Sequence, residues 1–327
     1  MFGGQTTVQI ARQASGGTAI TTMTSFHPIP HLSATLETAI AELGMDSMRN
    51  RFDEGPVQQG LISVQGDVGF RWQPEIIPVF FYGLTNVISS TNATPGSVSA
   101  THWFVPIQTE FDDNLSVQPW TIEEYKDGQR AHQYTDSLLS RLTLEIAGGQ
   151  LLRGTGTYMA RVSSEKAQTA PTYRTGVEVT WNQASVSLGG AGWPSFETLT
   201  FVFDNALEFV TTLDGTQSPR RIRRSGFRTC RVSGTIDLPV NSISGLFPDF
   251  RAGTERTLVV TVEGGTAISS GGFNRLKVDI PTFRYSAKRY NVTGPGRVTV
   301  GFDGRAVYNV GSAMLFLLSA QNSFTSY

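Results

Sequence analysis

The feature that most constrains this chain is a repeated alternation of apolar and polar residues with a period of two. Over residues 62–72 the apolar side chains fall on one face of an extended chain, and Ser63, Gln65 and Asp67 fall on the other. The same period recurs at residues 141–146, 230–238, 275–280 and 297–303. Segments of this kind are half-buried strands, with one face on a core and the other toward water. The sequence therefore predicts a mainly β fold of antiparallel sheets.

Helical signals are sparse. Ser33 is placed to cap a short helix over residues 36–43, and a second short helix is expected over residues 75–84, which Pro78 would bend or shorten. The most apolar run, residues 313–318, is too short for a membrane helix and predicts a buried strand. The first residues lack the basic and apolar regions of a targeting segment.

Two parts of the chain resemble each other. Residues 64–68, Val-Gln-Gly-Asp-Val, resemble residues 232–236, Val-Ser-Gly-Thr-Ile, and residues 141–146 resemble residues 275–280. Glycine falls on the apolar face of both strands, as a close backbone approach or a bulge requires. We expect two copies of one β unit, over residues 1–190 and 195–327, although any two alternating strands share some likeness.

The first unit is longer because of an insertion at about residues 88–135. The insertion begins with turn-forming residues and continues with aromatic and acidic ones, among them the pairs Asp112-Asp113 and Glu123-Glu124. A loop of this length is usually functional, so we expect it to dock against another surface. The two acidic pairs are compatible with a solvated loop face or with the carboxylate couple of a glycosidase.

Charge is scarce and unevenly placed. Charged residues make up 16% of the 327 residues and the formal net charge is −1, whereas about a quarter of a typical soluble protein is charged. Such a surface is common where it is buried in an assembly, and the net charge argues against general coating of nucleic acid. Six arginines nevertheless cluster between residues 220 and 231: Arg220, Arg221, Arg223, Arg224, Arg228 and Arg231. This cluster fits an interface between copies, a solvated loop or a phosphate contact.

A search for catalytic chemistry finds no complete motif. The chain has no phosphate-binding loop, dinucleotide fingerprint or nucleophile elbow. His27 and His31 have the spacing of a helical metal pair, but two prolines between them exclude that helix. Cys230 lies on the apolar side of a strand, which favours a buried, inert thiol. His102 and His132 are expected at a surface or an interface. We therefore expect no enzyme activity, no catalytic residue, no metal and no cofactor.

The order of weak motifs along the chain resembles the major tail proteins, or tail tube proteins, of long-tailed bacteriophages, in the class with two copies of the tube fold. In the first unit the resemblance covers residues 51–55, 62–68, 74–84, 102–106 and 120–124. In the second it covers residues 207–208, 213–215, 231–236, 250–254, 277–284 and 294–310.

The resemblance implies duplicated antiparallel β-sandwich or barrel units with short flanking helices, and a structural role. Tail tube proteins form rings that stack into the tube through which phage DNA leaves the capsid. With two folds in each chain, three chains would make a pseudo-sixfold ring, and a true hexamer is the alternative. Other tail proteins would meet the tube ends, DNA would pass without sequence recognition, and no membrane would be involved. Assembly would take place in the host cytoplasm and the product would lie in the virion tail.

In such a tube the polar strand faces are candidates for lining the lumen. They are Ser63, Gln65, Asp67, Thr143, Glu145, Ser233, Thr235, Asp237, Lys277 and Asp279. Candidates for contacts between subunits or rings come from the insertion and the arginine cluster. They are Trp103, Asp112, Asp113, Trp120, Glu123, Glu124, Arg220, Arg221, Arg223 and Arg224. The insertion is the candidate for reaching the next ring.

Two other functions fit parts of the sequence. A carbohydrate-binding β-sandwich of a virion or cell surface would use Trp103, Trp120 and Trp193 as a sugar platform. A β-rich hydrolase would use acidic residues of the insertion, such as Asp113 or Glu123.

Overall fold

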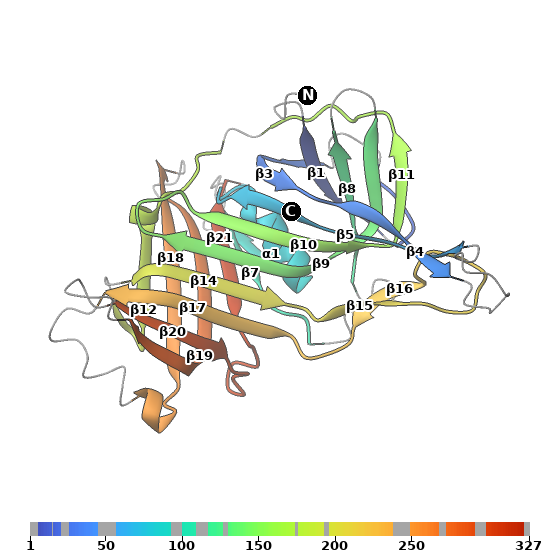
Figure 1. The fold of residues 1–327 in the computed structure, drawn as a ribbon. Helices are drawn as coiled ribbons and strands as arrows, with labels where there is room; N and C mark the ends of the chain where they lie inside the picture. The colour runs from blue at the N-terminus through green and yellow to red at the C-terminus, as the bar shows by residue number, and fades with distance from the viewer. Residues whose placement is uncertain are drawn as a thin grey trace.

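The computed structural model describes residues 6–14, 16–20, 26–44, 57–92, 100–108, 117–126, 130–173, 176–192, 196–237, 249–267, 273–291 and 299–323. The fold is mainly β, as predicted, and its paired strands are antiparallel (Figure 1). Among these residues no helix is both long and apolar enough to cross a membrane.

A long antiparallel sheet, here called the central sheet, runs through the whole molecule. Its strands pair in the order β4-β5-β10-β9-β14-β17-β20-β19. They are β4 (Glu37–Gly44), β5 (Val57–Arg71), β9 (Ala131–Ala147), β10 (Arg153–Ala160), β14 (Phe196–Asp204), β17 (Thr229–Asp237), β19 (Phe273–Asn291) and β20 (Thr299–Ala306). The short strand β3 (His31–Ala34) pairs with the other end of β5.

Two smaller outer sheets branch from the two longest strands. The first half of β9 pairs with β8 (Trp120–Tyr125) and β11 (Val162–Lys166), and β8 leads on to β1 (Thr7–Arg12) and β2 (His27–Ile29). The first half of β19 pairs with β18 (Arg256–Ala267) and β21 (Leu317–Asn322), and β18 leads on to β12 (Ala184–Leu188) and β13 (Ala191–Gly192). Each long strand thus belongs to two sheets, and the core lies between them.

The helix α1 (Ile77–Thr85) is part of this core. All of its residues are buried, and Pro78 sits in its first turn, where a missing N–H costs nothing. Phe80 stacks on Phe70 of β5 with ring centroids 3.8 Å apart. The prediction of a helix in this region is confirmed, and Pro78 starts the helix rather than bending it.

The predicted helix over residues 36–43 is wrong. These residues form strand β4, which pairs with β5 from Glu37 opposite Gln65 onward. Pairing along a neighbouring strand outweighs a weak helical pattern, because all eight residues of β4 are exposed and no apolar helical face is buried.

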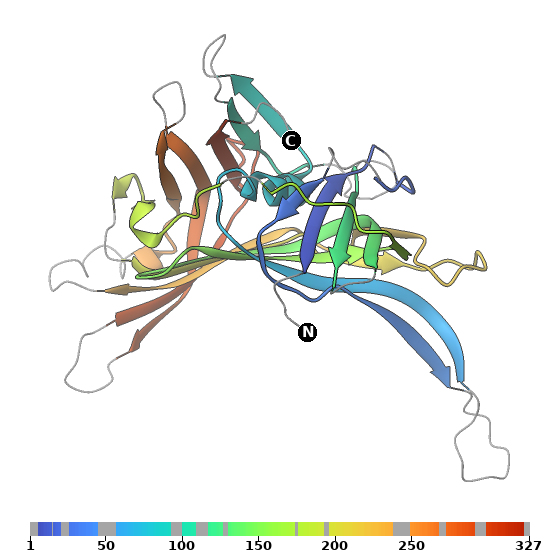
Figure 2. The same ribbon diagram turned by 90° about the horizontal axis from the view of Figure 1, so that it is seen from above.

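The predicted loop at about 88–135 also proves to be structured where it is described. It contains β6 (Ile88–Asn92), β7 (Ala100–Phe104), β8 and the start of β9. Strand β7 pairs with β6 on one side and with β21, from the end of the chain, on the other. Figure 2 shows this pair beside β21. Strands from the first half of the sequence therefore complete the outer sheet of the second half.

The apolar run at 313–318 only begins a strand. Phe316 is fully buried, but β21 spans Leu317–Asn322, and Ala313 has a φ of 53° in the turn before it. A left-handed residue cannot continue an extended strand, so the strand starts later than the apolar pattern indicates.

Candidate assembly surface

The polar face of the central sheet gathers eight of the ten candidate lining residues. Ser63, Gln65 and Asp67 alternate on β5 with the buried Val64 and Val68. Thr143 and Glu145 on β9 and Ser233, Thr235 and Asp237 on β17 alternate with buried residues in the same way. The strand pairings place these residues in rows across one face, opposite the core.

Side chains of adjacent strands contact one another across this face through hydrogen bonds and an ion pair. Thr157 Oγ1 donates to Asp67 Oδ1 at 2.6 Å. The guanidinium of Arg141 donates to Asp204 Oδ2 through Nε at 3.1 Å and through a terminal nitrogen at 2.8 Å. The hydroxyl oxygens of Thr198 and Thr235 lie 2.6 Å apart. The face is polar and contains the ion pair of Arg141 with Asp204, whereas Arg231 of β17 stands opposite Arg305 of β20 in the strand register.

Sequence reasoning missed several members of the face. They are Arg141 on β9, Arg153, Thr155 and Thr157 on β10, Thr198, Thr200 and Asp204 on β14, and Asp303 and Arg305 on β20. Leu199, Phe201 and Phe203 of β14 are buried and alternate with polar residues, a signal that was available. On β10 the inward positions 154 and 156 are glycines, which hide the alternation.

Lys277 and Asp279 lie elsewhere. They are on the first half of β19, between β18 and β21 in an outer sheet, where Lys277 Nζ is 2.8 Å from Asp279 Oδ2. The predicted equivalence of residues 141–146 and 275–280 is wrong. Residues 141–143 pair with β10, and the residues that pair in the same way with β20, the counterpart of β10, are 289–291. A single strand of 19 residues crosses two sheets, and alternation alone does not show where it changes partner.

The two glycines matched by sequence have matching surroundings. A Cβ on Gly66 would lie 2.4 Å from the carbonyl oxygen of Thr35, and one on Gly234 would lie 2.3 Å from that of Thr198. The hydroxyl of each threonine also accepts from the backbone N–H that follows the glycine, at 3.0 Å for Thr35 and 3.1 Å for Thr198. Both glycines are therefore needed for a close approach of two strands.

The central sheet ends in two open edges. Within the described residues β4 pairs only with β5, and residues 284–291 of β19 pair only with β20. Strand β4 also exposes apolar side chains, since Ile40 is 46% and Leu43 58% exposed. An open edge with exposed apolar residues is prone to pair with another strand.

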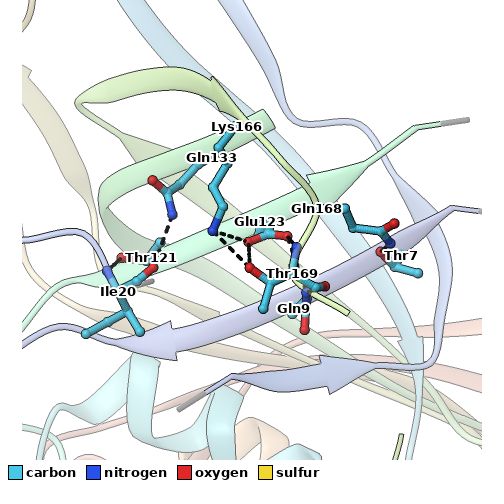
Figure 3. A network of polar contacts seen from close by, with 9 residues as sticks. All are labelled: Thr7, Gln9, Ile20, Thr121, Glu123, Gln133, Lys166, Gln168 and Thr169. Carbon is cyan, nitrogen blue, oxygen red and sulfur yellow. Dashed lines mark hydrogen bonds and ion pairs between the residues drawn. The ribbon is translucent and has the colours of Figure 1, made fainter. Parts of the chain in front are cut away.

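Glu123, a candidate for contact between copies, is instead buried in a polar network (Figure 3). Its carboxylate accepts from the backbone N–H of Thr169 at 2.6 Å and from Thr169 Oγ1 at 2.9 Å, and it lies 3.0 Å from Lys166 Nζ. Gln9 Nε2 donates to the carbonyl oxygen of Thr169 at 2.6 Å. These contacts hold the segment 167–173, through Thr169, against the first outer sheet. The buried carboxylate of Glu123 therefore cannot contact a second copy of the chain.

Glu124 and Trp120 are also buried within the chain. Glu124 lies 3.2 Å from Lys126 Nζ, and burial raises the pKa of its carboxyl group although Lys126 opposes the shift. Trp120 packs edge-on against Tyr82 with ring centroids 5.8 Å apart. Trp103, on β7, stays partly exposed. Asp112, Asp113 and Trp193 lie outside the described residues.

Four of the six clustered arginines, Arg220 to Arg224, lie at or on β16 (Arg221–Arg224), which forms a hairpin with β15 (Leu207–Val210), whereas Arg231 lies on β17. The hairpin extends beyond one end of the central sheet (Figure 1). Arg223 Nε lies 3.3 Å from Glu208 Oε1, and both side chains are partly exposed. Arg228 lies deeper and donates from Nε to Asn205 Oδ1 at 2.8 Å, and burial together with Arg224 lowers its pKa to about 9.

The structure also places the histidine and cysteine side chains that were considered as chemical sites. The described residues contain no group of three or more His, Cys, Asp or Glu side chains that could hold a metal. His102 is fully buried within the chain, with Nδ1 2.7 Å from Ser90 Oγ, so the expectation of a surface or interface position is wrong for this residue. Cys230 is buried, and burial raises the pKa of its thiol.

A comparison with models of protein families identifies the family of this chain. The model of the phage tail tube protein family matches residues 3–306. The chain belongs to the phage tail tube protein family. A search of curated proteins found no match.

Family membership confirms the resemblance to tail tube proteins that the sequence motifs indicated. A tail tube protein is a structural component of the phage virion and is located in its tail.

Proposed function

We propose that three copies of this chain close into a ring and that rings stack into the tail tube. The observation that carries this proposal is the order of the central sheet. Strands β4-β5-β10-β9 form one set of four and β14-β17-β20-β19 form another with the same order of pairing. The sets are joined edge to edge by β9 and β14. In the part of the chain that the structure describes, the other edge of each set has no partner strand.

This arrangement supports two units per chain and a pseudo-sixfold ring. Of the expected bounds, 1–190 and 195–327, the first needs to be shortened, because β12 (Ala184–Leu188) pairs with β18 of the second unit. If the β9–β14 junction within the chain is repeated between chains, six sets of strands from three chains close the sheet and no edge remains. Each new strand-to-strand hydrogen bond contributes about 0.5–1.5 kcal/mol net, and closure removes the exposed edges that favour unspecific association.

The polar face of the central sheet would then line the lumen through which DNA is ejected. Arg141 is held by Asp204, and Arg153 stands opposite Glu145 in the strand register. DNA binds most strongly where unpaired lysines and arginines cluster along its phosphates. Hydroxyls and these opposed charges would limit the hold on DNA over β9, β10 and β14, and the row of Arg231 and Arg305 would be the main basic part of the lining.

Stacking is assigned to the hairpin of β15 and β16 rather than to the segment 88–135. The described strands of that segment complete outer sheets, so its deletion would remove part of the fold. The hairpin extends beyond the sheet and carries Arg220, with a side chain that is 61% exposed, and Leu213, which is fully exposed (Figure 1). Reversing charge with Arg220→Glu and Arg223→Glu is expected to leave rings intact and shorten tubes in electron micrographs. Tubes of unchanged length would contradict this assignment.

Ring size is tested directly by mass and by microscopy. Three chains of 35.6 kDa give about 107 kDa, and a hexamer gives twice that mass. We expect mass photometry of purified protein at rising concentration to show the three-chain species, and negative-stain images to show rings or tubes with a central hole. A monomer that persists at every concentration would overturn the proposal, and a six-chain ring would overturn the proposed symmetry.

The carbohydrate-binding alternative finds little support. Its sugar platform needs three exposed tryptophans, and Trp120 is only 3% exposed. In the proposed role the chain is assembled in the host cytoplasm and meets other tail proteins at the ends of the tube.

A further inference from the structure

The two open edges of the central sheet differ in charge and are complementary. Strand β4 carries Glu37 and Glu42 and no lysine or arginine. Residues 284–291 of β19 include Arg284, Lys288 and Arg289 and no acidic residue. Opposite charges across a strand pair favour that pair, and like charges disfavour it. One edge is therefore suited to the other edge and not to a copy of itself.

The junction inside the chain supplies a template for how these edges meet. Phe203 of β14 stands opposite Leu142 of β9, and Asp204 stands opposite Arg141. The register continues at the backbone, where the N–H of Asn205 donates to the carbonyl oxygen of Ser140 at 2.8 Å.

Strand pairings transfer this template from one set of four strands to the other. Ile40 faces Ile62 in β5, and Phe203 faces Cys230 in β17. Since Gly66 and Gly234 are matched, residues 62 and 230 are equivalent, and so are residues 40 and 203. Following β10 and β20 in the same way makes residue 142 equivalent to residue 290.

Burial at the equivalent positions agrees with a missing neighbour. Phe203 is fully buried, whereas Ile40, its equivalent, is 46% exposed. The difference arises because β14 has β9 on its outer side, whereas none of the described strands pairs with the outer side of β4.

We infer that β4 of one chain pairs antiparallel with the second half of β19 of the next chain, with Ile40 opposite Tyr290. The same register sets Ala41 opposite Arg289 and Glu42 opposite Lys288. This inference rests on the proposed ring and fixes which residues meet in it.

Cysteine pairs test the register. Directly opposed residues of antiparallel strands have Cα atoms about 4.5–5.5 Å apart, within the range that a disulfide spans. The double variant Ile40→Cys with Tyr290→Cys is expected to form disulfides between chains on mild oxidation, giving covalent oligomers of up to three chains on non-reducing gels. The matched control, Ile40→Cys with Arg289→Cys, is one residue out of register and points its thiols to opposite faces, so it should cross-link far less.

The outcomes separate this inference from the proposed ring. Rings that form without cross-linking, or that cross-link equally in the control, would overturn the register and leave the ring standing. Absence of rings in the unmodified protein would overturn the proposed function itself. Both double variants should form rings under reducing conditions; if the 40/290 pair prevents them, a charge exchange takes over as the test.

The charge exchange uses Glu42→Lys, Lys288→Glu and the two together. Each single change is expected to raise the dissociation constant of the ring about fivefold, since it places like charges opposite each other. The double change should restore most of the affinity. Additive weakening in the double variant would overturn the pairing of these two positions.

Discussion

At the scale of single residues, the molecule depends on places where a side chain would not fit. Gly66 and Gly234 let a neighbouring strand come so close that its carbonyl oxygen occupies the space of a Cβ. The same threonine contact accompanies each glycine. A missing side chain is thus used twice for the same purpose.

We predict that Gly66→Ala and Gly234→Ala each lower the free energy of unfolding by about 2–4 kcal/mol, because the strand must move to admit the methyl group. Urea denaturation provides the measurement. Gly148→Ala is the control, since its nearest atom would be 3.6 Å away, and it should change stability by less than about 1 kcal/mol. Equal losses at all three positions would contradict the explanation.

Cys230 gives a second prediction at this scale. Its side chain is 1% exposed and burial raises the pKa of the thiol, so the reactive thiolate is scarce. A thiol reagent should leave the folded protein unmodified for hours and label it rapidly in urea. Fast labelling of the native protein, followed by absorbance, would show that the thiol is accessible.

At the scale of elements, alternation predicted the strands well and their partners poorly. The burial on β5 and β17 follows the sequence, because a half-buried strand records its face in every second residue. The run 36–43 was assigned to a helix because its partner β5 is distant in sequence, and β19 was aligned wrongly because it changes sheets along its length. The buried position of Glu123 could not be predicted either, since its partners Thr169 and Gln9 come from distant strands and segments.

The network around Glu123 leads to a prediction about one element, the segment 167–173. Glu123→Ala should lower the free energy of unfolding by about 3 kcal/mol, because Lys166 and the backbone of Thr169 lose a buried acceptor. It should also speed proteolytic cleavage within 167–173, which mass spectrometry can locate. The control Glu165→Ala breaks an exposed pair with Arg130 and should cost at most about 1 kcal/mol. Unchanged cleavage in Glu123→Ala would show that the segment is held in another way.

At the scale of the whole molecule, an open sheet with an acidic and a basic edge makes a prediction about salt. Screening shortens the reach of charges from about 10 Å at 0.1 M salt to about 3 Å at 1 M. The proposed ring should therefore dissociate at higher protein concentration in 1 M sodium chloride than in 0.1 M, as sedimentation velocity would measure. The fold of the single chain, followed by circular dichroism, should not change. A ring equally stable in both would show that charge contributes little to closure.

Strand β7 has a consequence for the outer wall of the proposed tube. It covers β21 in the second half of each chain, whereas no strand covers the corresponding outer side of β11 among the described residues of the first half. A six-part ring built from three chains therefore alternates between two kinds of outer surface. A peptide displayed on β6 or β7 would appear at three positions per ring rather than six, at twice the angular spacing. The outer wall of the proposed tube would therefore repeat three times around each ring, whereas the sheet that lines the lumen would repeat six times.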